Sequence, residues 1–435
     1  MVDADTGRGA LPHFEAFKPS PRLDVDDGAA YKYLNDNGYV VIANALDAEQ
    51  VAIAKDHFWN FVELTSGGEV RRSNPQTWNQ RSWGGNSENG LFETDGVGQS
   101  VFLWYIRSRP KVVRAFQHVW SLADPADLIM SFDGCCAFLP TSLDSSQRTL
   151  GGWYHTDQNG GTTGSNRYCV QGFVALTDQD SRTGGLSVLP GSHLRHAELF
   201  KAWSDGRVQA MRDFCILSRN EPMLGGGEAQ GAIRPRLVHA KAGDLVLWDS
   251  RSVHCNVPAW HSLDEVPLDA ALAAAGLAPL HEELMQQFKS VADAVWAWYN
   301  VFGSHRETMD ARLAACLHGW AEQLRLDLET ATDTNTPQLL RLVAYVCALP
   351  RARASSKVLQ SKRQAVLLGG TATHWPDRAE LKSINPGSPA IVDAFTLPPA
   401  ALQLLGCQGA IGEREKMLAQ LQQEVALLQA LDAAE

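Results

Sequence analysis

The pattern of hydrophobic and polar positions changes near residue 127. Before this point, the run YVVIA at 39–43 predicts a short strand. The apolar spacing that follows predicts an amphipathic helix with Asp47 as its N-cap. A stretch rich in Trp, Asn, Ser and Gly, at about 70–110, predicts irregular loops, and RPKVVRAFQHVWSLA at 109–123 predicts another helix. These segments form an entry layer for a larger core.

After residue 127 the chain breaks into short apolar runs separated by Gly, Pro, Asp and Ser. Such runs predict strands. They are DLIMSFDGCCAFLP, RYCVQGFVALTD, GLSVLPGSH, KAGDLVLWDS and, much later, LVAYVCALP. Short strands at this spacing are typical of a double-sheet jelly roll. We therefore predict a mainly β fold with flanking helices.

Two regions interrupt the strand pattern with helical spacing. Residues 264–332 are rich in Ala and Leu, and the tail after residue 413 carries a stripe of Leu and Val on one helical face. The predicted organisation is an N-terminal extension (1–27), a first core part with N-terminal helices (28–259), a helical insertion (260–335), final core strands (336–376) and a C-terminal helical extension (377–435). Both ends of the insertion are expected at the rim of the site, so it could form a lid or a subunit contact.

Composition narrows the classes of partner. The chain has 435 residues, of which 45% are hydrophobic and 20% charged, with a net charge of −11. This acidic balance disfavours a nucleic-acid partner, and no apolar run of about 18 residues predicts a membrane span. The 8 cysteines form no CxxC pair and are expected to be reduced thiols in the cytoplasm. A small-molecule substrate is the natural partner, bound by a monomer or a homodimer.

The stretch GGWYHTDQNG at 151–160 contains the first candidate ligands. Along a strand, His155 and Asp157 would point to the same face, as two ligands of one divalent metal do. By itself the tripeptide also fits a surface turn with an Asx hydrogen bond. A third ligand elsewhere in the chain is needed to decide between these interpretations.

A later histidine completes the set. The segment AGDLVLWDSRSVH predicts a turn and a buried strand, after which His254 follows a short connection. Two histidines and one carboxylate form the facial arrangement that holds Fe(II) and leaves positions open for oxygen chemistry. Four other histidines are expected to have structural roles, namely His57, His118, His239 and His374.

Between these segments lies GGLSVLPGSH at 184–193. Together, the three motifs resemble the phytanoyl-CoA dioxygenase family of iron(II)- and 2-oxoglutarate-dependent oxygenases. The resemblance covers most of residues 30–260 and resumes at about 336–376. It implies a double-stranded β-helix (cupin-like) core, Fe(II), 2-oxoglutarate and dioxygen, with His155, Asp157 and His254 as metal and catalytic residues. His193 is not a ligand in the family, and we expect it to hydrogen-bond its turn.

The family's arginine for the distal carboxylate of 2-oxoglutarate normally follows the last histidine by about ten residues. No arginine occurs between Arg251 and Arg306, and the helical insertion explains the gap. Arg341 opens the next strand-like segment, so the resemblance assigns it to the co-substrate, which a planar guanidinium can bind through two hydrogen bonds. Arg351 and Arg353 are the alternatives.

Two further residues are expected to contact the co-substrate. Asn256 stands where related enzymes place a small polar residue, and Gln171 or Phe173 faces inward from an adjacent strand. Four aromatic residues could line the pocket or pack in the core, namely Trp83, Trp104, Trp153 and Tyr154. The basic stretch RARASSKVLQSKR at 351–363 could hold an anionic substrate, but a solvated face is the favoured interpretation.

The resemblance implies oxidation of a small organic molecule, with release of succinate and CO₂. Halogenating relatives replace the carboxylate ligand by a small residue, so Asp157 favours hydroxylation or a related oxidation such as desaturation. Three alternatives remain open from the residues alone. They are a non-catalytic cupin-like metal-binding or sensory protein, a zinc hydrolase and an inactive scaffold.

Overall fold

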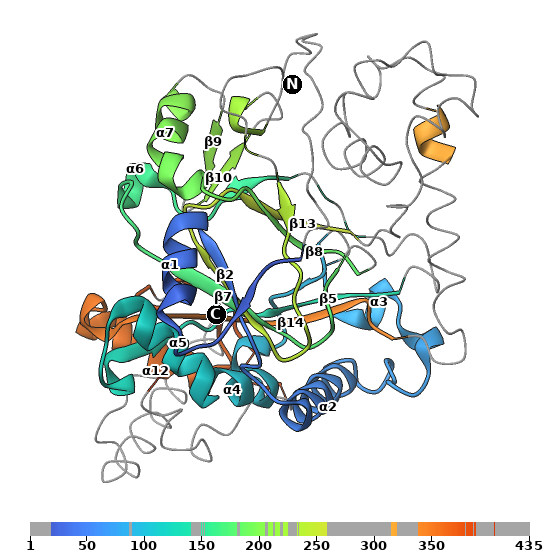
Figure 1. The fold of residues 1–435 in the computed structure, drawn as a ribbon. Coiled ribbons are helices and arrows are strands. Elements are labelled where there is room, and N and C mark those ends of the chain that lie inside the picture. Colours follow the sequence, from blue (N-terminus) through green and yellow to red (C-terminus); the bar gives the residue numbers. More distant parts are fainter. Residues whose placement is uncertain are drawn as a thin grey trace, which may run out of the picture.

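Two β-sheets face each other in the computed structural model, with helices beneath one of them (Figure 1). The structure describes residues 19–258, 315–319, 338–388 and 404, with gaps at 87–88, 141–148, 150, 152, 181–182, 205–207, 212–213, 218–220, 225–232, 234, 379 and 386. Most of the predicted insertion (260–335) and most of the predicted C-terminal extension therefore lie outside the described residues.

The larger sheet has eight strands within the described residues. Its order is β1 (Arg22–Leu23), β2 (Tyr39–Ile42), β12 (Leu245–Asp249), β7 (Val170–Ala175), β14 (Arg341–Pro350), β5 (Cys135–Phe138) and β3 (Leu91–Phe92), with β4 (Leu128–Met130) on β14. All pairs are antiparallel except β1 with β2. This arrangement places β14 inside the sheet, between β7 and β5, although a long segment separates it from β13 in the sequence.

The facing sheet has six described strands. Their order is β11 (Arg236–Leu237), β8 (Gly185–Val188), β13 (His254–Val257), β6 (His155–Thr156), β10 (Phe214–Leu217) and β9 (Val208–Met211). The two sheets do not close into a barrel within the described residues. The predicted mainly β, double-stranded β-helix fold is confirmed.

Alternation along the central strands separates two apolar layers. In β12, Leu245 and Leu247 face the helices, whereas Val246 and Trp248 face the second sheet. The same period of two in β14 sends Leu342, Ala344, Val346 and Ala348 to the helices. Arg341, Val343 and Tyr345 therefore point between the sheets.

The helical layer covers the outer face of the larger sheet (Figure 1). It consists of α1 (Gly28–Asn37), α2 (Ala48–Thr65), α4 (Val101–Arg107), α5 (Pro110–Trp120) and α12 (Ser356–Leu367). Helix α2 begins at the predicted cap, because Asp47 accepts from the Gln50 amide and the Gln50 side chain accepts from the Asp47 amide. Helix α1 ends at Gly38, which has a φ of 79° and lies so close to Ser252 and His193 that a Cβ would clash.

The region predicted as loop at about 70–110 contains short elements. These include α3 (Gln80–Trp83), β3 and α4. Elsewhere in the chain, β15 (Thr371–Ala372) and β16 (Leu381–Ser383) form a small separate hairpin. Trp83 and Trp104 are buried in the helical layer. No described helix is both long enough and apolar enough to cross a membrane.

Phe58 gives a test of the helical layer. Its ring is fully buried on α2 and contacts Trp83, Phe92 and Phe102 with centroid separations of 5.4–6.2 Å. Phe58→Ala should lower the free energy of unfolding by about 3–5 kcal/mol, because it leaves a cavity. Leu64→Ala, on the exposed side of the same helix, should change it by less than about 0.5 kcal/mol. Urea denaturation measures both, and equal losses would contradict this packing.

Candidate metal centre

Strand pairing brings the two predicted histidine ligands together. His155 opens β6 and His254 opens β13, and these residues are direct partners in the antiparallel register. Their ring centroids lie 4.4 Å apart, and both residues are buried. The facing positions follow from the strand register, which fixes side chains that are distant in the sequence on one face.

Asp157 completes the cluster from the turn after β6. One carboxylate oxygen lies 3.4 Å from Nε2 of His155 and the other 3.1 Å from Nε2 of His254. The three ligand atoms lie within 4.8 Å of one another. Burial alone would raise the pKa of Asp157, but the two neighbouring imidazoles outweigh it and hold that pKa well below its usual range.

Both imidazoles are oriented through their other nitrogen. Nδ1 of His155 lies 3.2 Å from the carbonyl oxygen of Trp153, and Nδ1 of His254 lies 2.9 Å from that of Ser252. A carbonyl oxygen only accepts, so each Nδ1 carries a hydrogen. Each Nε2 faces Asp157, and giving up a proton there leaves its lone pair for a bound cation. Two such nitrogens beside a carboxylate form a donor set that suits a divalent cation, and the predicted ligands therefore fit a metal.

Gln171 supports the carboxylate. Its side-chain amide on β7 donates to an Asp157 oxygen at 2.7 Å and to Ser250 Oγ at 3.1 Å. Sequence analysis expected Gln171 at the co-substrate, but these contacts place its amide against a candidate ligand. It can therefore fix which Asp157 oxygen faces the metal.

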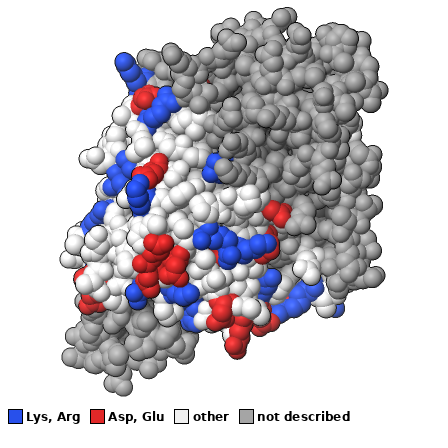
Figure 2. Space-filling model, in the orientation of Figure 1, with Lys and Arg blue, Asp and Glu red and all other residues white. Residues whose placement is uncertain are grey.

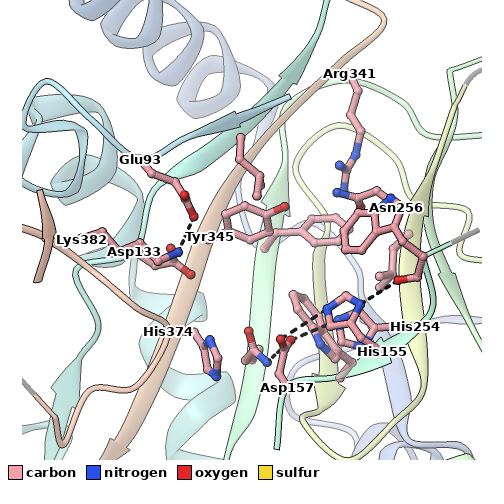
Figure 3. A pocket seen from close by; sticks show the side chains of 16 residues that line it. Glu93, Asp133, His155, Asp157, His254, Asn256, Arg341, Tyr345, His374 and Lys382 are labelled. Carbon is pink, nitrogen blue, oxygen red and sulfur yellow. Dashed lines mark hydrogen bonds and ion pairs between the residues drawn. The ribbon is translucent and has the colours of Figure 1, made fainter. Parts of the chain in front are cut away.

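The cluster opens into a cavity of about 140 Å³ between the two sheets (Figure 3). Apolar and aromatic side chains make up part of its wall, and polar groups face in from both ends. The lining residues outside the cluster are Leu91, Glu93, Asp133, Trp153, Gln171, Phe173, Leu186, Trp248, Asn256, Arg341, Tyr345, His374 and Lys382. A space of this size and lining suits a small organic ligand.

Arg341 reaches the same cavity from the start of β14 (Figure 3). Its residue is fully buried, and the guanidinium lies 5.1 Å from the Phe138 ring and 5.2 Å from the Phe173 ring. Nε donates to Gln179 at 3.3 Å and Nη1 lies 3.2 Å from the sulfur of Cys136. Nη2 has no hydrogen-bond partner, and no carboxylate of the described chain pairs with this cation. A buried cation with an open donor is suited to bind an anionic ligand.

The other expected residues divide between the cavity and the core. Asn256 lines the cavity on β13, where it hydrogen-bonds Tyr345, and Trp153 stacks on His155 with ring centroids 4.9 Å apart. His193 contacts the carbonyl of Asn35 at 2.8 Å, so it ties its turn to α1 instead of bonding within the turn.

Sequence analysis did not predict the acidic and basic residues on one side of the cavity wall. Glu93, Asp133 and Lys382 were not singled out, and His374 was grouped with the structural histidines although it lines the cavity. They come from loops and from the small β15–β16 hairpin, whose positions depend on the tertiary fold. The residue spacing inside each of these segments contains no pattern that would indicate a ligand site.

The sequence also matches known proteins. The sequence model for phytanoyl-CoA dioxygenase (PhyH) matches residues 34–255. A curated relative, the Ava biosynthesis cluster protein O of Aspergillus versicolor, is 30% identical over 162 residues, which are 37% of this chain and 50% of that protein. The chain thus matches about half the length of this curated relative.

Similar solved structures include two proteins of nogalamycin biosynthesis. One is the non-heme alpha-ketoglutarate-dependent carbocyclase SnoK, which is 16% identical with a TM-score of 0.32, covering 55% of this chain and 80% of that one. The other is the epimerase SnoN, in complex with Fe³⁺, alpha-ketoglutarate and nogalamycin RO. It is 18% identical with a TM-score of 0.30, covering 53% of this chain and 76% of that one.

Removing a ligand tests the metal centre. His155→Ala and Asp157→Ala should each abolish measurable binding of Fe(II), because two remaining donors cannot hold the cation in a facial site. Anaerobic titration calorimetry measures the binding, with about one Fe(II) expected for the unmodified protein. His118→Ala, which removes an exposed imidazole on α5, is the control and should bind normally. Normal binding by either ligand variant would place the metal elsewhere.

Proposed function

Since the chain belongs to the phytanoyl-CoA dioxygenase family, we propose that it is an iron(II)- and 2-oxoglutarate-dependent dioxygenase. It hydroxylates, or otherwise oxidises, a small organic molecule and converts 2-oxoglutarate and dioxygen to succinate and CO₂. The broader assignment, an oxygenase-type oxidoreductase, follows from the family. The co-substrate and the individual roles of the residues are the proposal.

One observation supports it above the others: a metal-ligand cluster and a buried arginine share one cavity. The cluster offers two neutral nitrogens and a carboxylate, which suit Fe(II). The arginine offers an open donor in an aromatic setting, which suits a carboxylate. A 2-oxo dicarboxylate meets both demands, because one end can coordinate a metal while the other pairs with a guanidinium.

His155, Asp157 and His254 would hold the iron, and bound iron would supply the redox chemistry that couples dioxygen to substrate oxidation. The remaining steps belong to the chain. Gln171 holds Asp157 in position, and Arg341 fixes the orientation of 2-oxoglutarate through its distal carboxylate. Phe138, Phe173 and Trp248 keep this end of the cavity dry, which strengthens the charge pairing.

Asp157 favours hydroxylation over halogenation. A halide ligand would need the position that the Asp157 carboxylate occupies beside both imidazoles. Retaining the carboxylate leaves the cluster with three protein ligands and therefore favours oxygen insertion or a related oxidation.

The alternative is a cupin-like metal-binding protein without turnover. Such a protein has no need for an unpaired cation in its cavity, whereas Nη2 of Arg341 is buried and without a partner. Formation of succinate from 2-oxoglutarate separates the two functions. If succinate formation requires Fe(II) and is lost in the Asp157→Ala protein, the turnover belongs to this site.

Arg341 gives the quantitative test. Arg341→Leu should raise the KM for 2-oxoglutarate at least about 30-fold, since loss of a buried charge-assisted pair costs roughly 2 kcal/mol or more. Affinity for Fe(II) should stay within about threefold, which calorimetry can measure. Succinate formation at varied 2-oxoglutarate gives the KM.

Arg353→Leu is the matched control, because Arg353 is exposed outside the cavity and stacks on Trp120. It should leave the KM unchanged. An Arg341→Leu protein with an ordinary KM, together with a sensitive Arg353→Leu or Arg351→Leu protein, would show that the co-substrate binds elsewhere.

A further inference from the structure

A second group of charges faces the cavity away from Arg341. Glu93, Asp133 and Lys382 lie together on the far side of Tyr345 from that arginine (Figure 3). Glu93 follows β3, Asp133 lies between β4 and β5, and Lys382 is in β16. If Arg341 and the metal cluster hold 2-oxoglutarate, this wall is left to contact the substrate.

The charges on this wall do not balance. Lys382 forms an ion pair with Glu93, and Ser383 Oγ donates to the Glu93 carbonyl at 2.6 Å, which fixes the hairpin there. Burial lowers the pKa of Lys382, but the carboxylates of Asp133 and Glu93 outweigh it and raise that pKa, so Lys382 stays an ammonium. Among these three residues two carboxylates thus share one ammonium on the cavity side, while the buried Arg107 guanidinium lies behind Asp133 and is held by backbone carbonyls.

Asp133 has an open acceptor. Its Oδ1 accepts from the Gly134 amide at 2.8 Å, and no hydrogen bond from the described residues reaches Oδ2. Gly134 packs so closely on strand β3 that a Cβ there would lie 1.8 Å from the Phe92 carbonyl oxygen. The carboxylate is therefore held in one orientation beside the cavity.

Buried cations fix the backbone beneath Asp133. Arg107 is fully buried, and its guanidinium donates to the carbonyls of Asp133 and Gly98. Lys362, also buried, donates to the Met130 carbonyl at 2.8 Å and lies 3.6 Å from the Phe132 ring centroid. Two desolvated basic side chains on one short segment are costly, and here they hold the segment that presents Asp133.

We propose that Asp133 binds a protonated amine of the substrate. This inference rests on the proposed function and names the substrate class for the same site. The amine would donate to the open oxygen of Asp133 and neutralise the charge left by Glu93 and Lys382. Tyr345, beside this wall, offers an aromatic surface that favours a cation. A substrate carboxylate would instead face the open oxygen of Asp133, an acceptor that offers it no donor.

The binding test uses probes that share a skeleton and differ in charge. The probes are benzylamine, benzyl alcohol and benzoate, with butylamine, butanol and butanoate as a second set. Calorimetry under nitrogen, on protein loaded with Fe(II) and 2-oxoglutarate, should show each amine binding at least tenfold more tightly than its alcohol and its acid. Asp133→Asn, which keeps the shape of the side chain, should remove this preference.

Two variants control for charge and for folding. Asp127→Asn removes an exposed carboxylate just before the same segment and should keep the amine preference. Lys382→Met leaves both Glu93 and Asp133 for the amine and should tighten amine binding several-fold. That gain cannot come from a merely damaged fold, so it tests the proposal even if Asp133→Asn proves unstable.

Three results would overturn the inference: no charge preference in the unmodified protein, a preference for the acids, or an amine preference that survives Asp133→Asn. The proposed function would stand in each case if succinate still formed from 2-oxoglutarate. Conversely, if the protein forms no succinate, the proposed function fails. An Asp133-dependent amine preference measured by the same calorimetry would then still identify an amine-binding site.

Discussion

The pairing of His155 with His254 across β6 and β13 is the contact on which the site depends. In an antiparallel pair, a shift of one residue turns a side chain to the opposite face of the sheet. Such a shift would separate the two imidazoles and remove the partners of Asp157. The register is held from both sides, since β13 also pairs with β8 over four residues and β6 with β10 over two. The metal site is thus a property of the whole smaller sheet.

The larger sheet contributes through the same periodicity. Alternation in β7 and β14 sends Gln171, Arg341 and Tyr345 between the sheets, while their neighbours pack under the helices. Gln171 then supports the metal cluster, and Arg341 offers a charge to a ligand. These polar residues occupy alternate positions on strands whose other positions form the hydrophobic core.

Local patterns predicted much of this structure. The strand at 39–42, the cap at Asp47, the central strands and the three candidate ligands all follow from short-range periodicity or motifs. Arg341 could be placed only through the family resemblance, because no spacing rule spans the long segment before β14. Asp133, in a loop, and Lys382, in the short strand β16, could not be predicted. Their approach depends on how β3, the β4–β5 connection and the β15–β16 hairpin meet in space.

The basic stretch at 351–363 is exposed at Arg353 and Lys357, as its composition predicted, but not throughout. Its composition predicted a solvated face, yet Lys362 is buried and burial lowers its pKa to about 7, with Arg107 contributing in the same direction. Its hydrogen-bond partner is a backbone carbonyl, and a carbonyl is present at every residue, so the sequence carries no sign of the contact. Arg107 is held in the same way. Lys362 and Arg107 stabilise the backbone segment from Met130 to Asp133 only while both keep their carbonyl partners. That segment places Asp133 beside the cavity.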